Sequence, residues 1–232
     1  MKIIISLPGE SFSSKFLMNW TKTILSLINE HKHEVFVVNA YESFVPFSRM
    51  RSLGLTNTTD PAMKKPFSGK IEYDIWITVD NDIIFTIENI LTLIDDIQTH
   101  DVVSGLYYTA NGVNFPVVAE MDKEYFIENG SFKYLTLQDI EEWKKEHPEQ
   151  SHMEVAFTGM GFFACKFGVI ETLNFPYFWT PLQTYRVKDG RYVSDVLCSE
   201  DVSFCMNLRD CGHKVYVNTG LIVGHEKKVV LN

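Results

Sequence analysis

The stretch YDIWITVDNDIIFT, residues 73–86, decides the fold. Its first seven residues form an apolar strand pattern, which stops at Asp80, Asn81 and Asp82 before apolar residues resume. Continuous apolar strands are typical of parallel sheets that are covered on both faces. The carboxyl ends of such strands open onto the crevice where ligands bind. We therefore expect these two carboxylates to face a binding crevice at the edge of a central sheet.

Strands and helices alternate on both sides of this stretch. Residues 2–6, 34–40 and 101–109 have the composition of buried strands, and Thr86 is a plausible N-cap for a helix that follows the acids. Residues 15–31 have apolar side chains at steps of three and four, which predicts a helix. The expected inward face of that helix comprises Phe16, Trp20, Ile24, Leu27 and Ile28. This alternation predicts an α/β fold with a mixed, mostly parallel sheet flanked by helices.

The second half of the chain departs from this alternation. Residues 114–147 predict a small antiparallel excursion, with a turn at Asn129 and Gly130 and a charged helix over residues 137–147. Residues 153–173 predict a strand followed by a helix, and residues 174–198, rich in aromatic side chains, have no clean period and predict a long functional loop. Residues 199–219 predict a helix that stops at Gly212, followed by the last strand.

Length, composition and net charge limit the classes of protein and partner that this chain fits. The 232 residues fit a single domain, 1–232, with 45% hydrophobic and 22% charged residues, which is ordinary for a globular protein. The net charge of -9 argues against a nucleic-acid partner, because that binding depends on clustered Lys and Arg. An acidic protein that binds small anions would need a cation to mediate the contact.

Segments for membranes, secretion and redox chemistry are not evident in the sequence. No apolar run approaches the roughly 18 residues of a transmembrane segment, and MKIIISLPGE is too short for the apolar region of a secretion signal. We therefore expect a cytoplasmic protein. The four cysteines contain no C-x-x-C pair, so we expect buried, reduced thiols.

The pair Asp80 and Asp82 is a candidate metal site. Two acids one residue apart repel each other unless a cation or strong donors lie between them, and oxygen ligands suit magnesium or manganese. The alternative is a turn in which the side chains accept bonds from loop amides. The nearest cations in sequence are Lys64, Lys65 and Lys70, and none lies in a phosphate-binding glycine loop.

Two further groups could carry chemistry. Glu200 and Asp201 follow Ser199, a plausible N-cap, and one of the carboxylates could act as a base or orient an acceptor. Acids are also favoured there by the helix dipole alone. His225 follows a short apolar strand and a glycine, where it could be structural or could complete a metal site with Asp82.

Five segments, in this order, resemble the GT-A family of nucleotide-sugar glycosyltransferases. They are LPG (7–9), SRMRSLGL (48–55), DIWITVDNDI (74–83), FTGMGFFACKFGVIETL (157–173) and SEDVSFCMNLRDCGHKVYVNTGLIVGH (199–225). The resemblance covers nearly the whole chain, and its specific part is the order of the motifs. The departures are Asn81, the middle residue of the aspartate motif, and a short C-terminal segment, which would leave little chain to form a closing lid.

The resemblance implies a divalent metal, Mn²⁺ or Mg²⁺, that bridges the diphosphate of the donor. Asp82 would be the more direct ligand, Asp80 would lie nearer the ribose, and His225 would be the C-terminal ligand. Residues Pro8, Gly9 and Glu10, with Arg49 or Arg51, would form the wall of the nucleotide site. Glu200 and Asp201 match the pair that supplies the base in inverting members.

The implied function is metal-dependent transfer of a sugar from a UDP- or GDP-linked donor to a hydroxyl of a glycan or other acceptor. Residues 1–110 would bind the nucleotide and residues 111–232 the acceptor. Inversion, slightly favoured, would use Asp201 or Glu200 as the base, whereas retention would leave the proton to the diphosphate or another group. The aromatic side chains of Phe178, Trp179 and Tyr185 could stack on an acceptor sugar or fill a hydrophobic plug.

Two alternatives remain open. A sugar-phosphate nucleotidyltransferase shares the architecture and the metal-bound acids, but it normally holds the triphosphate with a first loop rich in glycine and basic residues. LPGESFSSK has one glycine and a single Lys15. The other alternative is a non-catalytic module that binds a sugar or nucleotide.

Overall fold

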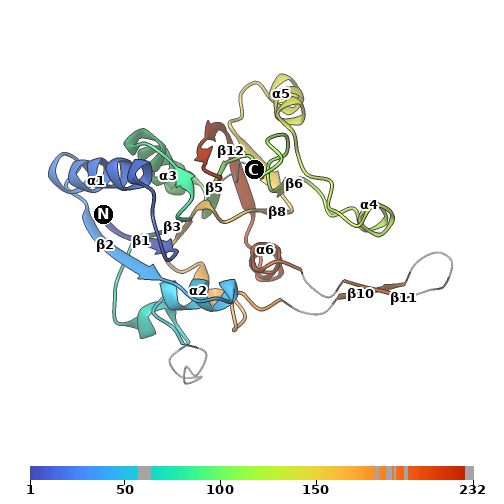
Figure 1. Ribbon diagram of the computed structural model, residues 1–232, viewed down its shortest axis with the longest axis horizontal. Helices are drawn as coiled ribbons and strands as arrows, with labels where there is room; N and C mark the ends of the chain where they lie inside the picture. The colour runs from blue at the N-terminus through green and yellow to red at the C-terminus, as the bar shows by residue number, and fades with distance from the viewer. Residues whose placement is uncertain (57–63, 181–182, 187–189, 191, 196–197, 228–232) are drawn as a thin grey trace, which may run out of the picture.

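A seven-stranded sheet organises the computed structural model, which describes residues 1–56, 64–180, 183–186, 190, 192–195 and 198–227 (Figure 1). The strand order is β2-β1-β3-β9-β5-β12-β7. These strands are β1 (Lys2–Pro8), β2 (Glu34–Ala40), β3 (Ile75–Val79), β5 (Val102–Leu106), β7 (His152–Val155), β9 (Phe162–Lys166) and β12 (Val215–Ile222). The α-helices are α1 (Ser14–Asn29), α2 (Val45–Ser52), α3 (Ile87–Thr99), α4 (Lys123–Asn129), α5 (Leu137–Glu146) and α6 (Glu200–Asp210).

The sheet is mixed and mostly parallel, as the alternation predicts. Strands β2, β1 and β3 pair in parallel, as do β5 and β12, whereas β9 and β7 run antiparallel to their neighbours. Three two-stranded antiparallel pairs accompany the sheet: β4 (Ile83–Ile84) with β13 (Gly224–His225), β6 (Val117–Val118) with β8 (Phe157–Thr158), and β10 (Gln183–Arg186) with β11 (Tyr192–Asp195). Short 3-10 turns occur at η2 (Pro66–Gly69) and η3 (Ile170–Thr172).

Two apolar layers cover the faces of the sheet. Helices α1 and α3 lie on one face and place Phe16, Leu27 and Ile90 against Ile3 and Ile77. Residues of α2, α5 and α6 lie on the other face in a cluster with the fully buried Trp76. The central strands β1, β3, β5 and β9 are therefore buried on both sides, which explains their nearly continuous apolar sequences.

Helix boundaries follow the capping residues. Thr86 caps α3 in a capping box with Asn89, and the Ser199 hydroxyl accepts a hydrogen bond from the Val202 amide at the start of α6. Both N-caps are confirmed. Gly212, with φ of +88°, follows the end of α6 as predicted.

Three predictions for the second half of the chain are wrong. Asn129 and Gly130 do not form a hairpin turn: residues 123–129 are helix α4, and Gly130 ends it in the left-handed conformation with φ of +64°. The helix expected before residue 173 is only the turn η3, because residues 162–166 form strand β9 and leave too short a segment for a longer helix. The segment expected as a long loop contains the antiparallel strands β10 and β11.

The inward face of α1 is also only partly as predicted. Phe16 and Leu27 are fully buried, and Trp20 and Ile24 pack against the same core cluster. Ile28 instead is 43% exposed. The helix therefore carries apolar side chains on a flank that the sheet does not cover.

Candidate functional site

A cleft of about 440 Å³ lies at the carboxyl ends of β1, β2 and β3, where the sequence places the binding crevice. Eight of the predicted site residues line it, together with Ser11, Tyr41, Glu42, Val45, Ser48 and Asn81. The eight are Pro8, Gly9, Glu10, Arg49, Asp80, Asp82, Glu200 and Asp201. Acidic residues predominate in this lining, so the positions of the cations around it decide what the cleft can bind.

Gly9 brings the first loop onto the aspartate motif. Its φ is +153°, and a Cβ at this position would lie 2.5 Å from Cβ of Asn81. The side-chain amide of Asn81 donates a 2.7 Å hydrogen bond to the carbonyl of Ser11. Asn81 therefore fixes the first loop against the motif, which gives a structural role to the residue that departs from the aspartate pattern.

Arg49 is the central cation of the cleft. Its side chain is only 3% exposed and donates two hydrogen bonds to the Asp80 carboxylate, at 2.6 and 3.1 Å, and a third to Thr78 at 3.2 Å. Burial alone would lower the pKa of Arg49, but the charges of Asp80 and Asp201 raise it above its ordinary value. The bidentate geometry fixes the orientation of the Asp80 carboxylate.

Glu200 and Asp201 face the same guanidinium. A carboxylate oxygen of each lies 3.8 Å from an Arg49 nitrogen, and the buried Oδ1 of Asp201 has no hydrogen-bond partner among the described residues. Burial and the nearby charge of Glu200 raise the pKa of Asp201, while Arg49 opposes the shift. Asp201 is therefore a stronger base than an ordinary carboxylate, and it has an unused acceptor atom.

Asp82 is held by two side chains of the C-terminal segment, an imidazole and an ammonium group. Its Oδ2 lies 3.1 Å from Nε2 of His225 and 2.7 Å from Nζ of Lys227. Antiparallel pairing of β13 with β4 places His225 opposite Ile83, next to the motif. Burial would raise the pKa of Asp82, but the hydrogen bonds from His225 and Lys227 lower it to about 2.

The second ring nitrogen of His225 determines what its Nε2 can do. Nδ1 lies 2.6 Å from the backbone carbonyl of Tyr108, which only accepts hydrogen bonds, so Nδ1 carries a proton. In the neutral ring Nε2 then presents a lone pair to the Asp82 carboxylate. That contact requires either a second proton on the ring or a cation between the two groups. The hydrogen bond with Asp82 accordingly raises the pKa of His225.

The cations that contact the two acids are not their nearest neighbours in sequence. Arg49 and Lys227 reach Asp80 and Asp82 through the tertiary fold. Within the described part of the chain, no cluster of three or more His, Cys, Asp or Glu side chains is arranged to hold a metal ion. Asp80 faces Arg49, so only Asp82 and His225 of the three predicted ligands lie together.

Tyr107 is a buried residue of the site that sequence reasoning missed. Its hydroxyl accepts a 3.0 Å hydrogen bond from the Gly161 amide, and its ring packs edge-on against His225 at 5.2 Å. The Gly161 carbonyl in turn accepts a 2.9 Å bond from the Asp80 amide. A Cβ on Gly161 would lie 2.8 Å from Cζ of Tyr107. The glycines at 159 and 161 were the available signal, because both permit this close approach.

The other predicted site residues do not line the cleft, or their side chains lie outside the part of the chain that the structure describes. Arg51 is more than half exposed and pairs with Glu42 at 2.6 Å, whereas Arg49, two residues earlier on α2, points inward. Phe178 stacks on Phe204 within the core, 4.6 Å between ring centroids, so it belongs to a hydrophobic plug and not to a stacking surface. Trp179 is 62% exposed, and the side chain of Tyr185 lies outside the described residues.

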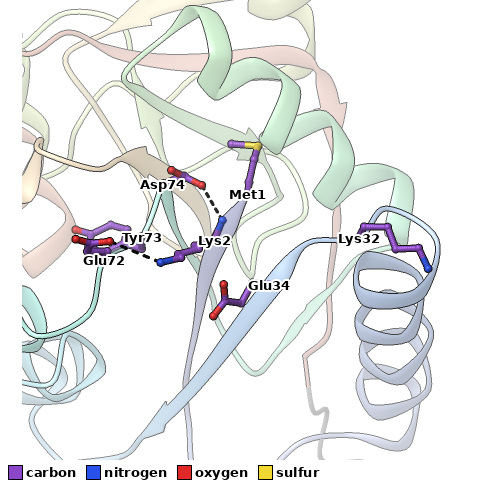
Figure 2. A pocket seen from close by; sticks show the side chains of 7 residues that line it. All are labelled: Met1, Lys2, Lys32, Glu34, Glu72, Tyr73 and Asp74. Carbon is purple, nitrogen blue, oxygen red and sulfur yellow. Dashed lines mark hydrogen bonds and ion pairs between the residues drawn. The ribbon is translucent and has the colours of Figure 1, made fainter.

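Figure 2 shows a second hollow, of about 360 Å³, around the amino-terminal ends of β1 and β2. The Lys2 amide donates a 2.7 Å hydrogen bond to Asp74, and the Lys2 ammonium lies 3.6 Å from Glu72. Lys2 thus contacts two of the acids that line this hollow, one through its backbone amide and one through its ammonium group.

The comparisons establish the fold. No family model and no curated protein sequence matches this chain. A197 from STIV matches with a TM-score of 0.50 at 15% identity, over 100% of this chain and 97% of that one. GalNAc-T7, crystallised with UDP, GalNAc and Mn²⁺, matches with a TM-score of 0.54 at 12% identity, over 98% of this chain and 43% of its own. This chain thus spans less than half of GalNAc-T7, and the shared architecture is the GT-A fold.

The described residues contain no helix long and apolar enough to cross a bilayer.

Proposed function

We propose that this chain is a metal-dependent glycosyltransferase that moves a sugar from a nucleoside diphosphate sugar to an acceptor hydroxyl. The observation that carries the proposal is the contact between Asp82 and His225, in which the proton on Nδ1 leaves Nε2 facing a carboxylate. The GT-A fold supports it, as does the presence of UDP and Mn²⁺ in the crystals of GalNAc-T7. The assignment of residues 1–110 to the donor and 111–232 to the acceptor is part of the same proposal.

The pair Asp82 and His225 fits a divalent cation. These side chains would supply a carboxylate oxygen and an imidazole nitrogen, which lie 3.1 Å apart and are ligand types that suit Mn²⁺. The Tyr108 carbonyl orients the imidazole in the manner usual for histidine ligands. Mn²⁺ or Mg²⁺ held here would neutralise the charge that develops on the departing nucleoside diphosphate.

The remaining residues of the cleft would position the donor. Asp80, oriented by Arg49, would accept a hydrogen bond from a ribose hydroxyl. Pro8, Gly9 and Glu10 would form the wall of the nucleotide site, which Tyr41 also lines. Arg51 does not line the cleft and would act only indirectly, through its pair with the lining residue Glu42.

Asp201 would be the base. Its unpartnered Oδ1 and raised pKa suit it to accept the proton of the acceptor hydroxyl as that oxygen attacks the sugar carbon and the bond to the diphosphate breaks. A base positioned for direct displacement corresponds to inversion of configuration. Glu200, beside the Nε of Arg49, would assist by holding the guanidinium in place.

The experiment is an assay of nucleotide release and sugar transfer with UDP- and GDP-sugars in the presence of Mn²⁺. Wild-type protein should release nucleoside diphosphate, and Asp201→Asn should bind the donor normally and lose transfer. Asp210→Asn, which removes an acid at the other end of the same helix and outside the cleft, is the control and should keep its activity. Full transfer by Asp201→Asn would show that another group is the base. An absence of turnover with every donor would refute the proposed enzymatic activity.

A further inference from the structure

Helix α1 has an apolar flank that nothing in the described chain covers. Leu17, Met18, Leu25 and Ile28 are between 43% and 58% exposed, although the helix already buries Phe16, Thr23 and Leu27 against the sheet. A surface helix normally carries one apolar stripe that faces its own core. Four large apolar side chains exposed on one helix, in addition to its buried face, are typical of a surface that binds another molecule.

Strand β2, which packs beside α1, is an open edge of the sheet (Figure 1). Within the described residues β2 pairs only with β1, and its sequence EVFVVNA contains no proline or lysine to blunt the edge. Val37 lies in register with Ile5, whose side chain belongs to the core under α1, yet Val37 is 50% exposed. Long apolar edge strands of this kind are normally paired or covered.

The exposed backbone of β2 is suited to a copy of itself. The Glu34 amide and the Ala40 carbonyl bond toward β1, so alternation turns the amides and carbonyls of Val35, Val37 and Asn39 toward the open edge. A two-fold axis through Val37 would place it opposite the partner's Val37 and place Val35 opposite the partner's Asn39. Both are hydrogen-bonded pairs in an antiparallel ladder, so the edge is self-complementary.

The local charge also favours a second copy. Residues 14–40 contain three lysines and two glutamates, whereas the whole chain has a net charge of -9. Two copies that meet through this segment therefore avoid most of the repulsion between acidic molecules. A lipid surface could accept the apolar flank of α1, but hydrocarbon cannot satisfy the free amides and carbonyls of β2.

We propose that the outward flank of α1 and the open edge of β2 form the interface of a symmetric homodimer. The two β2 strands pair antiparallel about Val37, and the central sheet continues through both subunits. The α1 flanks of the two copies lie on the same face of the paired strands as Val37 and cover them. This proposal is independent of the activity proposed for the cleft.

Sedimentation velocity over a concentration series tests this arrangement, with vesicle flotation as a second arm. Wild-type protein should sediment as a dimer at micromolar concentration, the range expected of a specific interface. Val37→Lys, which places two like charges across the axis, should weaken the dimer at least tenfold. Leu25→Lys on α1 should also weaken it, and it replaces Val37→Lys if that variant fails to fold.

Val113→Lys is the matched control, because Val113 is 58% exposed on a loop away from α1 and β2. It should leave the dimer intact, and circular dichroism should show the same secondary structure in every variant. Three results would each overturn the proposal. They are a wild-type monomer at about 100 μM, an unchanged dimer in both Val37→Lys and Leu25→Lys, and a monomer that floats with anionic vesicles.

Discussion

Replacement of Arg49 by Met tests the charge arrangement of the cleft. The guanidinium is 3% exposed and is the bidentate partner of Asp80, while Glu200 and Asp201 each lie 3.8 Å away. Removing one partner of a buried ion pair typically costs about 3–5 kcal/mol, because the remaining charge stays buried. Asp80 keeps some contact with solvent and Asp201 can take up a proton, so we expect a loss near the lower end, about 3 kcal/mol.

Urea and thermal denaturation followed by circular dichroism measure this loss. For a chain of this size, about 3 kcal/mol corresponds to a fall in Tm of about 6–12 °C. Arg51→Met is the matched control on the same helix: Arg51 is 53% exposed, and its pair with Glu42 should contribute at most about 1 kcal/mol. The double variant Arg49→Met, Asp80→Asn should lose less than the sum of its single changes, since the isolated acid is then absent.

One result would refute this reasoning. If Arg49→Met lost no more stability than Arg51→Met, the Asp80 carboxylate would not depend on its buried partner. The orientation of Asp80 toward a ribose would then lack its structural basis.

Three further predictions concern the residues around Arg49 and Asp82. Lys227→Met should bind Mn²⁺ about fivefold more tightly in calorimetry, because a half-exposed ion pair of about 1 kcal/mol no longer competes for Asp82. The control is Lys214→Met, which breaks the exposed pair with Glu154 and should not change the affinity for Mn²⁺. The pKa of His225 is raised, so its contribution to stability is full below pH 6.5 and is lost as pH rises through the folded-state value, while Mn²⁺ binding strengthens over the same interval. His225→Gln should flatten both profiles, and an unchanged profile would contradict the role of the imidazole. Gly161→Ala should lower the free energy of unfolding in urea by about 1–3 kcal/mol, because the added methyl group overlaps with the Tyr107 ring. The same change in a Tyr107→Leu background should lower it by less. Equal losses in the two backgrounds would show that Tyr107 is not the obstacle.

The sequence predicted the elements of the first half because burial and period agree there. Strands such as IWITV are apolar throughout, and the helix after them begins with a Thr that forms a capping box. The prediction of a turn at Asn129 is wrong because the pair Asn-Gly also ends helices. Here Asp122 caps a helix that begins at Lys123 and ends at Asn129. Local signals cannot decide between these outcomes when the strand pattern on either side is weak.

The members of the cleft were predictable, but their pairing was not. Eight of the ten predicted site residues line one cleft, because strand ends that follow apolar runs meet at one edge of a parallel sheet. Arg49 and Asp80 are 31 residues apart, and Asp82 and Lys227 are 145 apart, so no spacing rule connects them. The sequence indicated that the acids require cations, and only the tertiary fold identified them.

Calorimetric titration with UDP and GDP, with and without Mn²⁺, tests the central claim most directly. We predict that one of the nucleotides binds wild-type protein in a manner that depends on the metal, that Asp82→Asn abolishes this dependence, and that Asp210→Asn, an acid at the far end of α6, retains it. Equal binding with and without Mn²⁺, or metal-dependent binding that survives in Asp82→Asn, would contradict the metal-dependent donor site.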